Sequence, residues 1–415
     1  MEPVPAKEKR RPGSPDRRIL RRKLRAAPVD VKCRGACPAS AGVFPYGPMP
    51  KALKPSLNWL LPLTPIAIAV RFLAPEAHVW VFFLAGVAII PIAGWMGRAT
   101  EHLAARTGEG IGGLLNATFG NMAEIIIAIM ALREGLTEIV KASLTGSIIG
   151  NALLVLGASM LGGGLKFRIQ YFNPAGGRTR ATQLTLAAIA LLVPALFHQL
   201  AGPDGPPREG ALSLEISVIL LVVYGLALLF SLHTHEAYFT REAAEAGRIE
   251  EEAHEAWTVR RALVVLVVAT AVVSWLAEIL VGAVEPTAEA LGMTEVFIGV
   301  IVVAIVGNAA EHSTAILMAM KDRMDLALGI AIGSATQIAL FAAPVLVLLS
   351  YVIGPAPMDL VFTTAEVVAV AVAVVIVGQV AEDGESNWLE GVQLLAVYVI
   401  LALMFYFLPE ASGVE

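Results

Sequence analysis

The sequence is dominated by long apolar runs that have charged residues at their ends. Most runs are about 20 residues long, the length that a helix needs to cross the hydrocarbon core of a bilayer. Helices satisfy their own backbone hydrogen bonds inside a membrane, and alternating segments of the barrel type do not occur here. The 57 % share of hydrophobic residues and the mean hydropathy of +0.72 agree with a membrane protein. We therefore predict an all-α integral membrane protein with about eleven transmembrane helices, near residues 57–73, 78–98, 110–132, 138–164, 182–198, 211–232, 259–284, 294–320, 326–353, 358–380 and 388–408.

Two of these apolar runs carry the same short motif with an acid at its end. The stretch GNMAE at residues 120–124 recurs as GNAAE at residues 307–311, and the same offset of 187 residues carries Gly146-Ser147 onto Gly333-Ser334. A carboxylate within an apolar helix is costly, so it is a candidate functional group. Two such acids at matching positions of a duplicated unit predict an ion site at the interface between the repeats.

The duplication divides the chain into two halves. The first five-helix repeat is predicted over residues 78–232 and the second over residues 259–408. An odd number of helices in each repeat places the two repeats in opposite orientations. We therefore predict two inverted five-helix repeats plus an extra N-terminal helix at 57–73, with an acidic cytoplasmic loop or helix at 233–257 and a short tail at 409–415.

The N-terminal tail, residues 1–56, is basic and lacks apolar periodicity. Residues 1–54 hold 14 Lys and Arg against four acids, and the tail is predicted to be disordered. Its basic cluster could bind anionic membrane lipid, and a translation start at Met49 is an equally open interpretation. Cys33 and Cys37 are the only cysteines of the chain and have no His nearby, so we expect no metal or redox role for them.

Lys and Arg are unevenly distributed among the connections, which predicts the orientation. With a cytoplasmic N-terminus, the inside connections carry twelve of these residues and the outside connections carry four, namely Arg71, Arg133, Lys141 and Arg208. The N-terminus is therefore predicted to be cytoplasmic and the C-terminus extracytoplasmic. The Ala-, Gly- and Val-rich composition, without eukaryotic sorting signals, favours the plasma (inner) membrane of a prokaryote.

The two motif acids, Glu124 and Glu311, are the candidate cation and proton ligands. Each has an asparagine three residues before it, Asn121 and Asn308 respectively, and neither has a Lys or Arg within one helical turn. Two carboxylates with amide oxygens form the kind of hard, anionic ligand set that calcium prefers. A carboxylate that snorkels to water or pairs with a base is the alternative, and the missing base and the depth of both residues disfavour it.

A pair of carboxylates in an apolar surround favours competition between protons and a cation. Low dielectric disfavours the ionised form, and two neighbouring carboxylates disfavour joint ionisation further. The empty site is therefore expected to hold protons near neutral pH, and a divalent cation is expected to displace them. That competition is the chemistry of an antiporter.

Further polar residues lie near the two acids in the pattern. Ser147 and Asn151 form a short polar stripe on one helix, and Ser334 and Gln337 form another. These four side chains are candidate ligands or lining residues, and hydrogen bonding between helices is an equally open interpretation. His312 and Glu278, the latter expected to be a buried acid, are candidate proton relays, with interhelical packing as the alternative for His312.

The motifs strongly resemble the cation/proton exchanger family, the calcium/proton branch of the calcium/cation antiporter superfamily. The resemblance is carried by residues 115–124, 146–157, 307–344 and 383–391 and extends over roughly residues 57–408. It implies eleven helices, an acidic segment after the sixth, and Glu124 and Glu311 as shared ligands. The implied transported ions are calcium and protons, without a cofactor, in a protein that is not an enzyme.

Other functions are weighed against exchange of calcium for protons. Sodium-driven exchange is the first alternative, but sister branches tend to have Asp in the second central motif, where this chain has Glu311-His312. A passive cation channel is disfavoured by the inverted duplication. No HExxH or GxSxG motif indicates an intramembrane enzyme, no EF-hand loop indicates a calcium sensor, and no nucleic-acid partner is expected. The sequence does not predict an oligomeric state.

Overall fold

The structure is a computed structural model that describes residues 57–107, 112, 115, 118–201, 206–239 and 257–409. The predicted N-terminal tail, most of the acidic segment and most of the C-terminal tail lie outside the described residues. The helices and strands named below all belong to the unit Pro55–Glu415.

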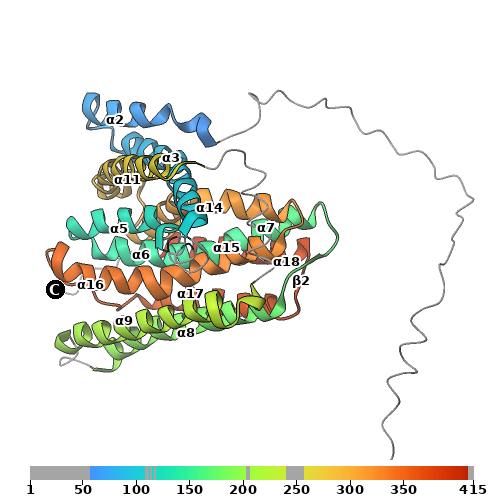
Figure 1. The fold of residues 1–415 in the computed structure, drawn as a ribbon. Coiled ribbons are helices and arrows are strands. Elements are labelled where there is room, and N and C mark those ends of the chain that lie inside the picture. Colours follow the sequence, from blue (N-terminus) through green and yellow to red (C-terminus); the bar gives the residue numbers. More distant parts are fainter. Residues whose placement is uncertain are drawn as a thin grey trace, which may run out of the picture. The chain divides into compact units, whose positions relative to one another are not determined.

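The first half of this unit is helical almost throughout (Figure 1). Its elements in chain order are η2 (Leu57–Leu60), α2 (Leu63–Leu73), α3 (His78–Thr107), α5 (Met122–Arg133), α6 (Thr137–Ile149), η3 (Gly150–Val155), α7 (Leu156–Gly164), β1 (Gln170–Tyr171), α8 (Pro174–Ala201), α9 (Pro206–Leu229), η5 (Phe230–Thr234) and η6 (Glu236–Tyr238).

The second half has a similar sequence of elements. They are α11 (Val259–Val281), α12 (Val284–Leu291), α13 (Glu295–Phe297), η7 (Ile298–Val303), α14 (Ala304–Ala319), α15 (Met324–Gln337), η8 (Ile338–Ala342), α16 (Ala343–Ile353), α17 (Thr364–Val380), β2 (Glu385–Ser386) and α18 (Trp388–Phe407). The short helix α12 was not predicted; it lies between the seventh and eighth predicted spans.

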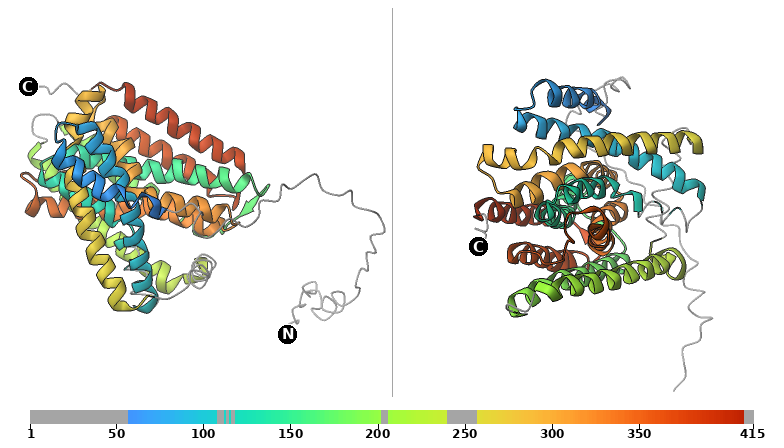
Figure 2. Two further views of the ribbon diagram at one scale, coloured as in Figure 1. Left: turned by 90° about the horizontal axis from the view of Figure 1, so that it is seen from above. Right: turned by 90° about the vertical axis from the view of Figure 1, so that its left-hand side faces the viewer.

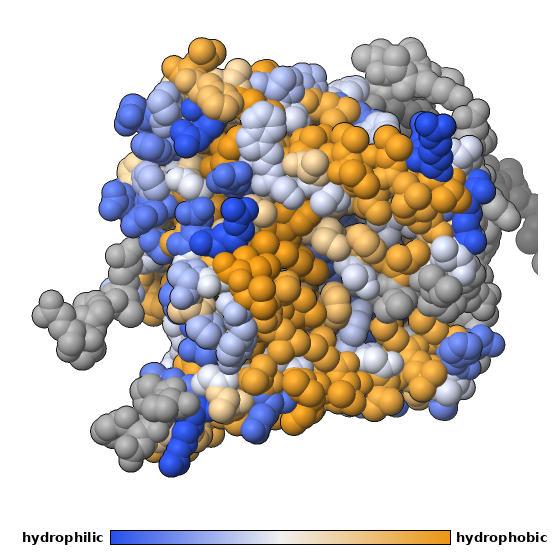
Figure 3. All heavy atoms as spheres, turned by 60° about the vertical axis from the view of Figure 1, so that its left-hand side comes forward, coloured by the Kyte–Doolittle hydropathy of each residue, from blue (hydrophilic) through white to orange (hydrophobic). Residues whose placement is uncertain are grey.

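The predicted class, an all-α integral membrane protein, is confirmed. Within the described ranges, eight helices are long and apolar enough to cross a membrane, and Leu57–Leu73 and Thr364–Val380 are shorter apolar helices. Figure 3 shows apolar side chains covering a broad part of one face of the molecule. The number of eleven transmembrane helices stays a prediction, because the third predicted span lies partly outside the described residues.

Two long helical rods contain a π-helical segment at matching positions. The rod Thr137–Gly164 contains η3, and the rod Met324–Ile353 contains η8. Residues 338–342 of η8 correspond to residues 151–155 of η3 under the offset of 187. A π-helical turn inside an α-helix rotates the following side chains and is frequent at functional sites.

Close approach of backbones explains several glycines of these rods. A Cβ atom on Gly146 of α6 would collide with the carbonyl group of Val300 in η7. Small residues allow helices in a membrane to approach in this way, and the gain in packing holds them together. Elsewhere in the bundle, α3 packs along α11 (Figure 2).

The β-structure among the described residues is one two-stranded antiparallel ribbon, in which Gln170 pairs with Ser386. The ribbon joins the connection after α7 to the connection before α18. Helix α18 begins with a capping box formed by Asn387 and Glu390. A Cβ atom on Gly391 would lie 2.7 Å from the carbonyl oxygen of Gly157. Residues 383–391, one of the resembling stretches, therefore serve to dock α18 on α7.

Candidate functional site

Glu124 lies in the first turn of α5 and packs against the second copy of its own motif. Its side chain is buried at 7 % exposure. A Cβ atom on Gly307 would lie 2.9 Å from the Cγ atom of Glu124, so only glycine leaves room for this side chain. Gly307 precedes Glu311 by one turn of α14. The glycine of the second motif thus brings the acid of the first motif beside that of the second.

Glu311 lies on α14 and is half-buried. It interacts electrostatically with Glu124, and Ser334 on α15 supplies a polar neighbour. Its Oε2 atom is buried and accepts no hydrogen bond from the described part of the chain. The two carboxylates therefore approach each other, and one of them presents an oxygen that a proton or a cation can occupy.

Two reciprocal hydrogen bonds join the repeats next to the carboxylates. The Nδ2 atom of Asn308 donates to the Oγ atom of Ser147 over 2.9 Å. The Oγ atom of Ser334 donates to the Oδ1 atom of Asn121 over 2.7 Å. The offset of 187 residues exchanges these two pairs. Each motif asparagine is thus bonded to the serine of the opposite repeat.

Two further amides join this network without a counterpart in the other repeat. The Nδ2 atom of Asn151 donates to the Oδ1 atom of Asn308 over 2.9 Å and to the Oγ atom of Ser334 over 3.1 Å. The Nδ2 atom of Asn121 donates to the Oε1 atom of Gln337 over 2.7 Å. The positions equivalent to Asn151 and Gln337 are Ile338 and Gly150. The site is therefore asymmetric.

A backbone carbonyl sets the direction of these hydrogen bonds. The Nδ2 atom of Asn308 also donates to the carbonyl oxygen of Ala304 over 3.0 Å, so the Oδ1 atom of Asn308 must face Asn151 as an acceptor. Asn151 then presents its amide hydrogens to the network. Its Oδ1 atom is left buried without a donor among the described residues. A buried acceptor is costly unless a partner satisfies it, so this oxygen is a second acceptor available to a cation or a proton donor.

The two copies of the motif adopt different backbone conformations. Asn121 directly precedes α5 with φ −95° and ψ 24°, outside the helical region, and its side chain does not cap the helix. Asn308 lies inside α14. Glu124 is consequently close to a helix N-terminus, whose dipole favours a negative charge, whereas Glu311 is not. The motif alone does not distinguish these two environments.

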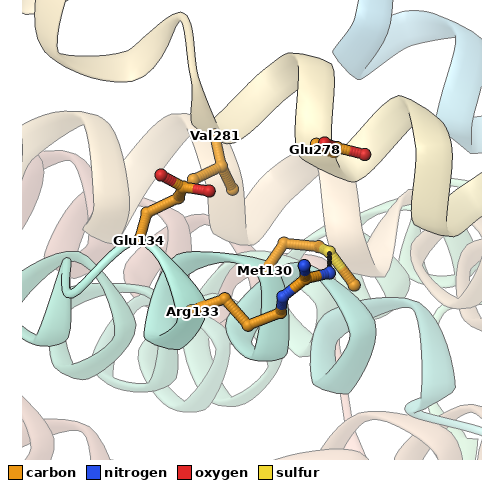
Figure 4. Close-up of a pocket in the computed structure, with 5 residues that line it drawn as sticks. All are labelled: Met130, Arg133, Glu134, Glu278 and Val281. Carbon is orange, nitrogen blue, oxygen red and sulfur yellow. Dashed lines mark hydrogen bonds between the residues drawn. The ribbon is translucent and has the colours of Figure 1, made fainter. Parts of the chain in front are cut away.

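The two candidate relay residues differ in their surroundings. The Nε2 atom of His312 is buried and makes no hydrogen bond within the described ranges. Glu278 is exposed on α11, three residues before the helix ends at Val281, so the expected burial of this acid is wrong. Glu278 lines a pocket together with Met130, Arg133, Glu134 and Val281 (Figure 4). A position so close to the helix end leaves its carboxylate accessible.

The ligand set is made of mixed oxygens, not of clustered acids or histidines. No group of three or more His, Cys, Asp and Glu side chains suited to a metal occurs among the described residues. Two carboxylates, amide oxygens and hydroxyls suit a hard cation that is bound and released. The arrangement thus fits a cation that is a substrate.

A family comparison agrees with this arrangement. The family model described as sodium/calcium exchanger protein matches residues 77–233 and 261–407. The chain belongs to this family. The matched ranges contain both carboxylates and every amide and hydroxyl of the network, and the resemblance drawn from the motifs is confirmed.

Several relatives within the family match most of the chain. A Ca²⁺/H⁺ antiporter of Synechocystis is 46 % identical over 365 residues, which cover 84 % of this chain and 96 % of the relative. The Ca²⁺/H⁺ antiporter ChaA of Bacillus subtilis is 49 % identical, with 78 % and 90 % covered. The structure of native YfkE is 43 % identical with a TM-score of 0.71 and covers 85 % of this chain and 100 % of that one. A crystal structure of the H⁺/Ca²⁺ exchanger CAX, 15 % identical with a TM-score of 0.59 and 84 % and 91 % covered, shares the fold.

Three features of the site were absent from the sequence prediction. They are the contact between Gly307 and Glu124, the carbonyl of Ala304 as the fixed acceptor, and the π-helical turns after Ser147 and Ser334. The contact between Gly307 and Glu124 had one signal in the sequence, because a glycine precedes the acid in both motifs. No sequence signal indicates which carbonyl a buried amide selects.

Proposed function

We propose that this chain is a secondary active transporter that exchanges calcium for protons across the membrane by alternating access. Glu124 and Glu311 bind the cation and the protons in turn. The observation that carries the proposal is the placement of the Glu124 side chain on Gly307, which brings the two carboxylates together inside the helix bundle. The names of the bacterial relatives support calcium and protons as the exchanged ions.

Charge balance explains why the two fluxes are coupled. One divalent cation neutralises two carboxylates, and so do two protons. With neither bound, two negative charges would face each other in an apolar surround, which is strongly disfavoured. The change between the inward-facing and outward-facing conformations is therefore unfavourable while the site is empty and ionised. The transporter exchanges one kind of load for the other and does not leak either ion.

The surrounding amides and hydroxyls complete the cation site in this proposal. Two buried oxygens of the site have no hydrogen-bond donor among the described residues, the Oδ1 atom of Asn151 and the Oε2 atom of Glu311 itself. Asn121, Asn308, Ser147, Ser334 and Gln337 hold the four site-bearing helices together and supply further oxygens when their mutual hydrogen bonds rearrange. His312, which follows Glu311 in the chain and has a buried Nε2 atom, is the candidate relay for the proton.

The proposed setting is the plasma (inner) membrane of a prokaryote. The chain is a multi-pass membrane protein, and its bacterial relatives support this location. A cytoplasmic N-terminus and an extracytoplasmic C-terminus follow from the distribution of Lys and Arg. Labelling a single cysteine at Ser412 from the outside, with the chain otherwise free of cysteine, tests this orientation.

Reconstitution into proteoliposomes tests the function. With an imposed pH gradient, calcium uptake is expected without sodium on either side, and a pH-sensitive dye should report proton movement in the opposite direction. A sodium gradient should not replace the pH gradient. Calcium flux that needs sodium would support the sodium-coupled alternative, and calcium flux without proton movement would support a channel.

A further inference from the structure

A second charged cluster lies where α6 meets the segment that precedes α17, with Lys141 buried and its partners Glu138 and Asp359 reaching the surface at 57 % and 35 % exposure. Its centre is Lys141, which the sequence-based topology assigned to an outside connection. The structure places Lys141 inside α6, with its side chain only 8 % exposed. Lys141 lies in the rod Thr137–Gly164, which is long and apolar enough to cross a membrane. An ionisable side chain buried in such a helix requires a partner and is a candidate functional residue. The exchange described above does not use it.

Three oxygens surround the Lys141 ammonium. Its Nζ atom lies 2.7 Å from the Oε1 atom of Glu138 and 3.3 Å from the Oδ1 atom of Asp359. It also donates to the carbonyl oxygen of Val361 over 3.0 Å. Glu138 belongs to the first repeat, whereas Asp359 and Val361 belong to the second. An ammonium has three hydrogens to donate, so these oxygens occupy all of them.

A third acid lies behind this oxygen cage. Glu366 in α17 is 2 % exposed and interacts electrostatically with Lys141. Its Oε1 atom accepts a hydrogen bond from Thr145 over 3.2 Å, and its Oε2 atom accepts one from the backbone nitrogen of Thr363 over 2.9 Å. Three acids therefore face one lysine, and the cage remains anionic even with the ammonium in place.

The equivalent place in the other repeat has no lysine. Under the offset of 187 residues, Glu138 corresponds to Asp325 and Lys141 corresponds to Leu328. Asp325 accepts a hydrogen bond of 2.6 Å from the backbone nitrogen of Asn173, in the connection that precedes α8. Both repeats thus tie the start of a site-bearing rod to the opposite repeat. In the first repeat, a lysine contacted by oxygens from both repeats makes this tie.

We propose that Lys141 is a built-in cation, which fills an oxygen cage at the repeat interface that would otherwise bind free calcium. Carboxylates and a backbone carbonyl are the ligands that calcium takes in proteins. Without the ammonium, the cage would offer two carboxylate groups and one carbonyl, with the buried carboxyl group of Glu366 behind them. The lysine thereby confines calcium to the pair Glu124 and Glu311. This consequence for exchange rests on the proposed function, whereas the cation preference of the cage does not.

The test compares two variants that remove the same charge. Lys141→Ala empties the cage, whereas Lys141→Met removes the charge and fills the space. Both are made in a chain that also carries Glu124→Gln and Glu311→Gln, so that the proposed transport site contributes little calcium binding. Lys166→Ala is the control, because Lys166 is exposed and donates a hydrogen bond to the carbonyl oxygen of Met320. Thermal unfolding and equilibrium dialysis are measured in calcium chloride against choline chloride at equal ionic strength.

We expect Lys141→Ala to gain one bound calcium per chain and a saturable rise in Tm with calcium. Neither gain is expected in the parent, in Lys141→Met or in Lys166→Ala. A Lys141→Ala chain that folds only when calcium is present also supports the proposal, because the metal then replaces the ammonium.

Three results would overturn the proposal. One is an equal calcium response in Lys141→Ala and Lys141→Met. Another is no calcium response in a folded Lys141→Ala chain. The third is a Lys141→Ala chain that stays unfolded in calcium, because a metal would then be unable to replace the amine. Since the transport site is disabled in every variant, none of these results bears on the proposed exchange.

Discussion

Replacing Gly307 by alanine tests the placement of the two carboxylates directly. The added Cβ atom would lie 2.9 Å from the Cγ atom of Glu124, and ordinary contact begins near 3.4 Å, so one of the two groups must move by about 0.5 Å. A misplacement of about 1 Å at a reacting centre costs roughly 100-fold. Half that displacement predicts a loss of about tenfold in apparent calcium affinity or exchange rate.

The same substitution should change stability only modestly. Overpacking in a filled interior costs about 1–3 kcal/mol, and alanine inside a helix recovers about 1 kcal/mol relative to glycine. The net loss is therefore at most about 2 kcal/mol, which leaves a folded protein for the transport assay. An activity loss larger than the stability loss is the signature of a displaced ligand.

Gly378→Ala is the matched control for this prediction. Gly378 also lies inside an apolar helix, α17, but a Cβ atom there would meet no atom within 4 Å. It should keep parental exchange and gain slightly in stability. Both variants are reconstituted, and pH-driven calcium uptake is measured over a range of calcium concentrations. Parental affinity and rate in a folded Gly307→Ala protein would refute the reasoning, because Glu124 would then not need its place on that glycine.

Four further predictions concern the site and its supports. Glu124→Gln and Glu311→Gln should each fold yet lose at least about 100-fold in calcium affinity. Each change removes one carboxylate from the bound divalent cation, and removing one partner of a buried pair of opposite charges costs about 3–5 kcal/mol. Near-parental uptake would contradict the assignment. The parental protein should need more calcium at lower pH, because protons compete for the same oxygens, and this dependence should flatten in both variants. Asn151→Ala should cost about 1–3 kcal/mol, because it leaves the Oδ1 atom of Asn308 without its donor; an unchanged Tm would count against the network. Gly391→Ala should lower Tm more than Asn151→Ala or either Gln variant, because the rigid backbone of α7 lies against Gly391. Normal stability would show that α18 can shift.

Much of the architecture follows from the order of residues alone. The apolar runs predict membrane helices because their length matches the bilayer and because no other element satisfies its backbone there. Every predicted run contains a helix within the described residues. The errors lie at places where local pattern is a weak guide. Glu278 was expected inside a helix bundle, but the last turn of α11 exposes it, and Lys141 was expected in a connection, but it lies in the interior.

The sequence by itself determined the class of protein, the duplication and the identity of the residues that meet at the site. Glu124, Glu311, the two motif asparagines and the two serines are recognisable because polar groups are rare in apolar helices and recur here at one offset. Spacing along a helix predicts which side chains share a face. It does not predict which face of another helix they meet.

Only the tertiary structure decided the partners. It paired Asn121 with Ser334 and Asn308 with Ser147, placed Glu124 on Gly307, and enclosed Lys141 in oxygens from both repeats. Each of these contacts depends on how far apart two helix axes lie and how each helix is rotated about its own axis. Those quantities are set by packing over the whole bundle, where glycine allows backbones to touch and larger side chains keep them apart.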